Sequence, residues 1–288
     1  MPPFCDEVTA IHGKNAVKSN HETCKGDFMA NGCISIDRIL EKLDQYLHAN
    51  DYLSAERHLK YWHDEARLAR DVRAELFLLN ELMGLYRKTN RQSEAVECAE
   101  QALGLAHENF ARTVTAATTY INAATVYKAF SLAGGAIPLF EAAREIYERL
   151  LDKNDTRLGG LYNNMGLALV DLSRFGEAKE AYQKAIGVMS KHQDRDGEVA
   201  ITYLNLATAA EREHGLVDGD EMIQGYLDIA ESLLENCKER DGYYAFVCEK
   251  CASVFGYYGR FAYEKTLYKR AEAIYSENRA GGALNERA

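Results

Sequence analysis

Apolar and small side chains recur at three- and four-residue steps through most of the chain, and the pattern is clearest over residues 161–186. This spacing predicts two amphipathic helices joined by a tight turn near Ser173–Gly176. Small residues, Gly166 and Ala178, are expected where the two helices come close. Large side chains would form one buried stripe across both helices: Tyr162, Met165, Leu169, Tyr182 and Ile186.

The same pattern returns along the chain. A residue that closes each predicted helix pair falls at Trp62, Ala102, Ala143, Ala185, Ala230 and Ala271, in steps of 40, 41, 42, 45 and 41 residues. Self-similarity at a fixed period indicates stacked structural repeats. We therefore expect one continuous domain over residues 34–278, built from helix pairs at about 35–70, 71–111, 112–152, 153–196, 197–240 and 241–278.

The stretch 161–186 resembles a tetratricopeptide repeat. The residues that carry the resemblance are Tyr162, Met165, Gly166, Leu169, Ala178, Tyr182 and Ala185, which fill the family's positions 4, 7, 8, 11, 20, 24 and 27 in order. The resemblance implies an all-α fold, a right-handed α-α superhelix (a solenoid) of about six helix pairs, with the first helix of each pair on the concave inner wall. Because the period exceeds 34 residues, these units are similar to the longer repeats of kinesin light chains and bacterial peptide sensors.

The two ends and the fifth pair depart from the regular pattern. Residues 1–33 are polar and have no helical period, so we interpret them as a disordered or loosely docked N-terminal arm. Residues 279–288 are interpreted as a flexible tail. In the fifth pair, the turn near Glu213–Asp220 is four residues longer than its counterparts, which predicts a longer loop there.

Composition supports an all-helical protein and narrows its partners. Only 3 of the 288 residues are Pro, and the formal net charge is -10. An acidic chain repels phosphate backbones, so we expect no nucleic-acid partner. No apolar run is long enough to cross a bilayer and no secretory leader is present, so we predict a cytoplasmic protein without a membrane partner.

Motifs of catalysis are missing from the sequence, which predicts that the protein is not an enzyme and needs no cofactor. Seven cysteines, an odd number spread over the chain, do not indicate a disulfide framework. Cys248 and Cys251 form a Cys-x-x-Cys pair in the middle of a predicted helix. Because no second ligand pair accompanies them, we interpret them as core packing and predict no metal site.

Asparagine recurs at one register of the predicted first helices. Asn122, Asn164 and Asn205 occupy position 6 of three successive repeats, and Asn80 and Asn163 stand one place earlier. Asn is a poor residue inside a helix, and its amide can both donate and accept hydrogen bonds. The family resemblance implies that such a column of amides binds a peptide backbone. The alternative, that the amides bond neighbouring helices or face water, stays open.

Lys128 is the basic residue of the third pair that we place nearest the inner wall, where it could select an acidic ligand. The alternative is an ordinary solvated charge. The carboxylate clamp of chaperone-type repeats would need basic residues at Gly160 and Asn164, so an acidic chaperone C-terminus is not the expected ligand.

Three functions are consistent with these observations. The first is a protein–protein or peptide-binding module that holds an extended segment in a concave groove. The second is a peptide-responsive regulatory sensor without its own DNA-binding domain. The third is a structural scaffold or homo-oligomer joined through the terminal repeats.

Overall fold

The computed structural model describes residues 29–30 and 33–285. Its contacts divide the chain into two compact units. We call the described residues up to Leu151 the N-unit and those from Asp152 onward the C-unit. Each unit is described by itself, and the sequence-based expectation of one continuous domain stays a prediction.

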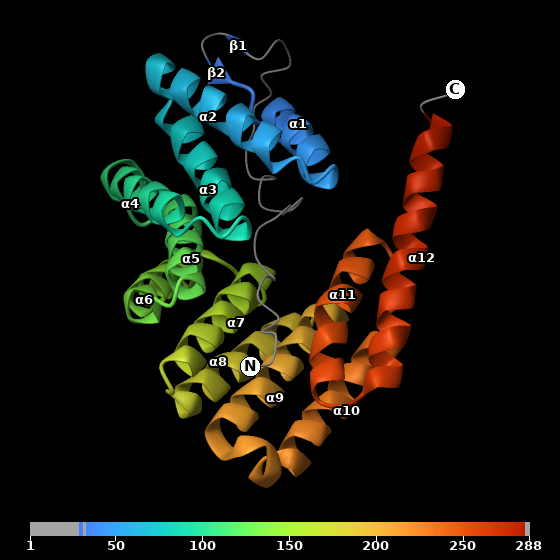
Figure 1. The fold of residues 1–288 in the computed structure, drawn as a ribbon. Coiled ribbons are helices and arrows are strands. Elements are labelled where there is room, and N and C mark those ends of the chain that lie inside the picture. Colours follow the sequence, from blue (N-terminus) through green and yellow to red (C-terminus); the bar gives the residue numbers. More distant parts are fainter. Residues whose placement is uncertain (1–28, 31–32, 286–288) are drawn as a thin grey trace. The chain divides into compact units, whose positions relative to one another are not determined.

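The N-unit contains a short hairpin followed by three helix pairs (Figure 1). In the hairpin, β1 and β2 are antiparallel and Met29 pairs with Ile34. The elements are β1 (Met29–Ala30), β2 (Cys33–Ile34), α1 (Ile36–His48), α2 (Tyr52–Ala69), α3 (Val72–Lys88), α4 (Gln92–Asn109), α5 (Val114–Ala129) and α6 (Ala133–Leu150).

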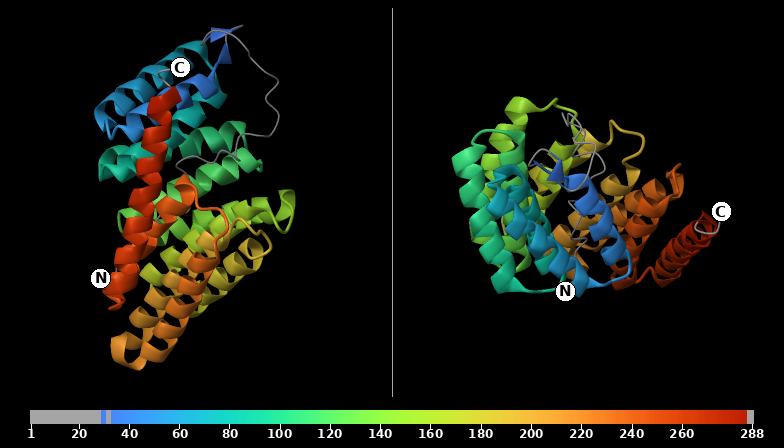
Figure 2. Two further views of the ribbon diagram at one scale, coloured as in Figure 1. Left: turned by 90° about the vertical axis from the view of Figure 1, so that its right-hand side faces the viewer. Right: turned by 90° about the horizontal axis from the view of Figure 1, so that it is seen from above.

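The C-unit contains three further helix pairs. Their members run side by side in opposite directions, as the views of Figure 2 show for the orange and red helices. The elements are α7 (Thr156–Asp171), α8 (Phe175–Met189), α9 (Asp196–Asp218), α10 (Asp220–Asn236), α11 (Gly242–Tyr257) and α12 (Phe261–Asn285). The described residues thus confirm an all-α fold with six helix pairs.

The turns inside five of the six pairs share one backbone feature. A residue in the left-handed region follows the first helix, namely Asn50, Asn90, Ser131, Ser173 and Gly259. The residue after it donates its N–H to a carbonyl five residues back, as from Arg91 to Tyr86 at 2.8 Å and from Leu132 to Tyr127 at 2.7 Å. This bond satisfies a carbonyl that the end of the helix would otherwise leave without a partner.

The starts of several helices are fixed by carboxylates. Asp71 accepts from the Ala74 N–H at 3.0 Å, and Asp241 accepts from the Tyr244 N–H at 3.0 Å. These side chains satisfy a free N–H in the first turn and place negative charge at the positive end of the helix dipole. Asp71 also accepts from the Ile34 N–H at 3.4 Å, which ties β2 to the start of α3.

Alanine holds the two helices of each pair close together. Five of the six pair-closing residues are Ala and are at most 1% exposed, from Ala102 to Ala271, whereas Trp62 of the first pair is half-buried against the N-unit core. Cys248 and Cys251 are fully buried in the C-unit core, as expected of packing residues. Free cysteines in these positions act as small apolar side chains.

The fifth pair differs from the sequence expectation of a long loop. The left-handed Gly215, at φ 82°, falls where the other first helices end, but α9 resumes after this kink and continues to Asp218. Gly219 donates its N–H to the Gly215 carbonyl at 3.1 Å, so the inserted residues form an additional helical turn. The expectations for residues 1–28, 31–32 and 286–288 lie outside the described residues.

We expect Gly166→Ala to destabilise the protein. A Cβ at this position would lie 2.5 Å from Cε1 of the fully buried Tyr182 on α8. Overpacking of this kind costs about 1–3 kcal/mol. The control is Gly187→Ala, at an exposed position inside α8 where an added Cβ meets nothing within 4 Å. That change should stabilise by about 0.5–1 kcal/mol. Urea unfolding of both variants measures the difference, and equal stabilities would contradict the close approach.

Candidate functional site

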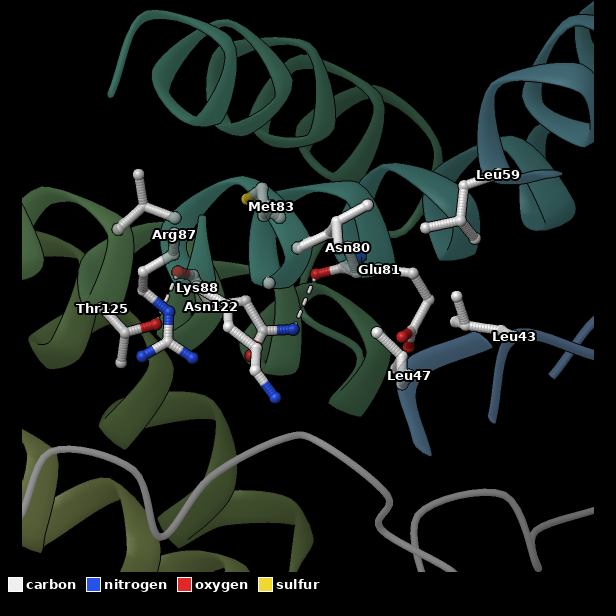
Figure 3. Close-up of a pocket in the computed structure, with 13 residues that line it drawn as sticks. Leu43, Leu47, Leu59, Asn80, Glu81, Met83, Arg87, Lys88, Asn122 and Thr125 are labelled. Atoms are coloured by element: carbon white, nitrogen blue, oxygen red, sulfur yellow. Dashed lines mark hydrogen bonds between the residues drawn. The ribbon is translucent and has the colours of Figure 1, made fainter. Parts of the chain in front are cut away.

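The N-unit carries an open groove that is lined mainly by residues of its first helices (Figure 3). Its empty space is about 580 Å³, including the part that is open to solvent. The lining comes from α1, α2, α3 and α5 and consists of Leu43, Leu47, Leu59, Asn80, Glu81, Met83, Gly84, Leu85, Arg87, Lys88, Asn122, Thr125 and Val126. Two of the predicted site residues, Asn80 and Asn122, are therefore in this groove.

The two asparagines form a hydrogen-bonded pair between neighbouring first helices. Asn122 Nδ2 on α5 donates to Asn80 Oδ1 on α3 at 2.8 Å. Asn80 Nδ2 donates in turn to the Leu76 carbonyl at 2.8 Å and to Thr119 Oγ1 at 3.2 Å. Both amides are half-buried. Asn80 has therefore used its donors, whereas Asn122 has used one N–H, and its Oδ1 accepts no hydrogen bond from a described residue.

The C-unit contains the same arrangement at the same spacing. Asn163 on α7 faces Thr202 and Asn205 on α9, as Asn80 faces Thr119 and Asn122. Asn163 Oδ1 accepts from Asn205 Nδ2 at 3.1 Å and from Thr202 Oγ1 at 3.2 Å. The sequence analysis did not single out the two threonines. The signal that could have found them is their shared place, three residues before the asparagine in Thr119-Tyr-Ile-Asn and in Thr202-Tyr-Leu-Asn.

The second copy differs from the first in its burial. Asn163, Asn164 and Asn205 are 3%, 4% and 1% exposed. α7 is buried on all its faces from Leu158 to Val170. Asn163 Nδ2 is buried with no hydrogen-bond partner among the described residues. As the structure stands, these amides are not surface groups, in contrast to the half-buried pair of the N-unit.

Lys128, the remaining predicted residue, is half-buried on α5 and is not among the residues that line the groove. The groove's charges come from residues that sequence reasoning did not single out: Glu81, Arg87 and Lys88. Lys88 Nζ lies 5.5 Å from the centre of the Tyr52 ring. An apolar end at Leu43 and Leu47 and basic residues on the last turn of α3 give the groove two chemically different ends.

Glu81 is the acidic residue of the groove, and the pKa of its carboxyl group is raised. Burial and the nearby Asp44 carboxylate raise the pKa of Glu81 to about 7. In the close-up of Figure 3 its side chain points toward the apolar end formed by Leu43 and Leu47. The low polarity of this end disfavours the charged form of the carboxyl group.

No group of three or more His, Cys, Asp or Glu side chains among the described residues could hold a metal ion. None of the described helices combines the length and the apolar character that crossing a membrane requires. Stacked helix pairs that repeat about every 40 residues and line a groove define a helical-repeat protein of the solenoid class.

Comparison with known proteins places the chain within that class. Residues 115–191 match the tetratricopeptide repeat family. BtubC from P. vanneervenii is 20% identical and aligns with a TM-score of 0.61 over 69% of this chain and 79% of that one. TPR-like repeats attributed to a kinesin light chain of Podosopora anserina are 16% identical, with a TM-score of 0.50 over 71% of this chain and 96% of theirs. Residues 115–191 therefore match the tetratricopeptide repeat, and the likeness to the solved structures shows the same helical-repeat fold.

More distant comparisons add no argument about function. A Rap protein complexed with competence and sporulation factor is 14% identical, covers 82% of this chain and 73% of its own, and has a TM-score of 0.49. No curated protein matches the sequence significantly.

We expect the free energy of unfolding to fall as the pH rises from about 4.5 to about 7, because Glu81 loses its proton over this range. Its folded pKa is raised above the ordinary 4.5, so the folded state binds the proton more tightly than the unfolded chain does. The stabilisation is complete at low pH and is lost as the pH passes the folded pKa. Glu81→Gln should reduce this dependence of the free energy of unfolding on pH, which urea unfolding at several pH values measures. An unchanged dependence, or the same reduction in the exposed control Glu97→Gln on α4, would contradict this assignment.

Proposed function

We propose that the N-unit groove binds an extended segment of a partner protein, with the Asn80–Asn122 pair bonding its backbone. The observation that supports this most directly is the state of Asn122. Its amide is half-buried in the groove and has one N–H and its Oδ1 left after bonding Asn80. A peptide group offers the complementary C=O and N–H, which an amide can bind whatever the neighbouring side chains.

The two ends of the groove suggest the character of the ligand. Leu43, Leu47 and Leu59 form an end that suits one apolar side chain. Arg87 and Lys88 follow on α3 beyond the amide pair and suit a carboxylate. We therefore propose a ligand with an apolar residue followed, a few positions along, by an acidic one. Lys128 would add to the attraction for acidic ligands from outside the groove.

A role in bonding a ligand backbone is less well supported for the buried amides of the C-unit. Asn163 and Asn205 are bonded to each other, and Asn164 is as buried as they are. Their burial favours the alternative that emerged from the sequence, in which the amides hold neighbouring helices together. A ligand role for these three residues is proposed only for a state of the C-unit in which they are accessible.

We expect Asn122→Ala to weaken peptide binding about tenfold, because one or two hydrogen bonds to the ligand backbone would be lost at roughly 1 kcal/mol each. The probe is a peptide selected from a displayed random library against the full chain, and calorimetry measures its affinity. Urea unfolding of the same variant separates this loss from the stability that the bond to Asn80 contributes.

A matched control is Asn109→Ala. Asn109 is exposed on α4 and donates only to the Leu105 carbonyl of its own helix, at 3.1 Å. It should leave the affinity unchanged. If the Asn80→Ala, Asn122→Ala double variant binds the selected peptide as tightly as the wild type, the groove assignment is wrong.

A further inference from the structure

The outer face of α2 carries an apolar stripe that the equivalent helices lack. Leu53, Tyr61 and Leu68 are 65%, 57% and 78% exposed. They are separated by eight and seven residues, so they lie on one side of the helix. This side is opposite the buried Ala55 and Leu59, which pack into the N-unit core.

The neighbouring repeats show that the stripe is not required by the fold. The positions equivalent to Leu53, Tyr61 and Leu68, 40 residues later on α4, are Ser93, Gln101 and Glu108, all exposed. The next equivalents, on α6, are Gly134, Ala142 and Arg149. Exposed apolar side chains gathered in a row mark a contact surface more often than a bare one, so these three on one helix face indicate a covered surface.

The charges between these residues indicate what covers it. Arg57 and Asp64 lie on the same side of α2, between the apolar positions. Arg57 donates to the Ser54 hydroxyl at 3.2 Å, and its charge acts on the Asp51 carboxylate at the start of the same helix. The Asp64 side chain is 73% exposed and lies 3.9 Å from Nδ1 of His63, a ring whose charged form is disfavoured because burial lowers its pKa. Two opposite charges therefore stand exposed, seven residues apart on one helix face.

This arrangement is self-complementary for an antiparallel neighbour. Leu53 and Leu68 lie at equal distances on either side of the midpoint between Lys60 and Tyr61, and so do Arg57 and Asp64. A twofold axis at this midpoint brings Leu53 opposite Leu68 of a second copy and Arg57 opposite its Asp64, each contact occurring twice. A parallel neighbour would instead oppose like charges.

We infer that α2 is a self-association surface, on which a second copy of this chain packs its own α2 in the antiparallel direction. The two Tyr61 rings meet near the twofold axis. The seam is one 18-residue helix from each copy, or about 27 Å long. An interface of this size falls at the small end of specific contacts, so the dimer forms and dissociates with concentration. The groove is not part of it, since only the buried Leu59 of α2 lines the groove.

Sedimentation velocity of the full chain over a roughly hundredfold concentration range tests this inference, because weak interfaces dissociate on dilution. We expect a monomer–dimer equilibrium for the wild type. Asp64→Arg and Arg57→Asp should each weaken the dimer at least about tenfold, since each places like charges opposite one another twice. The double variant Arg57→Asp, Asp64→Arg should restore it. All these positions are exposed, so the monomer should keep its helical circular dichroism and melting temperature.

The control is Glu97→Arg, which changes the charge at the α4 position equivalent to Arg57 and should leave the equilibrium unchanged. Leu68→Glu should abolish the dimer through the apolar contact instead of the charges. The inference is overturned by a wild type that remains monomeric at every concentration, which includes the case in which another protein covers this face. It is also overturned by a dimer that tolerates both single charge changes, or by a double variant that stays monomeric.

Discussion

The close approach of two helices within each pair is the constraint on which the rest of the structure depends. Alanine closes five of the six pairs with no more than 1% of its surface exposed, and Gly166 lets the Tyr182 ring lie against the backbone of α7. Larger side chains at these points would separate the helices and remove the dispersion contacts between them. Because neighbouring pairs within a unit also pack on each other, a displacement of one pair shifts the contacts of its neighbours in that unit.

That packing also decides which polar groups remain for a ligand. The same amide–hydroxyl arrangement occurs between α3 and α5 and between α7 and α9, and it bonds first helices that the apolar contacts already hold together. In the N-unit it leaves part of Asn122 available in a groove. In the C-unit the arrangement is buried. Under the proposed function, this motif holds helices together in both units and also binds a ligand where it is accessible, in the N-unit.

Sequence periodicity predicted the all-α class and the number of helix pairs because small residues at close contacts and residues at tight turns leave local signals. The bounds of α3 and α4, at Val72–Lys88 and Gln92–Asn109, fall inside the predicted pair 71–111. The site was less predictable. Glu81, Arg87 and the leucines of α1 belong to the groove through contacts between repeats, which no single repeat encodes. The additional helical turn after Gly215 was missed because insertions usually form loops.

The spacing of the contacts also has a consequence for how the chain folds. The hydrogen bonds Asn80–Asn122 and Asn163–Asn205 each join residues that are 42 positions apart in the sequence, about one repeat. Closing a short loop costs little chain entropy, and proteins whose contacts have short sequence separations fold quickly. Within each unit, structure can begin at any helix pair and spread to the adjacent ones. Partial unfolding of a unit is accordingly expected to begin at its outer pairs and to reach its middle pair last.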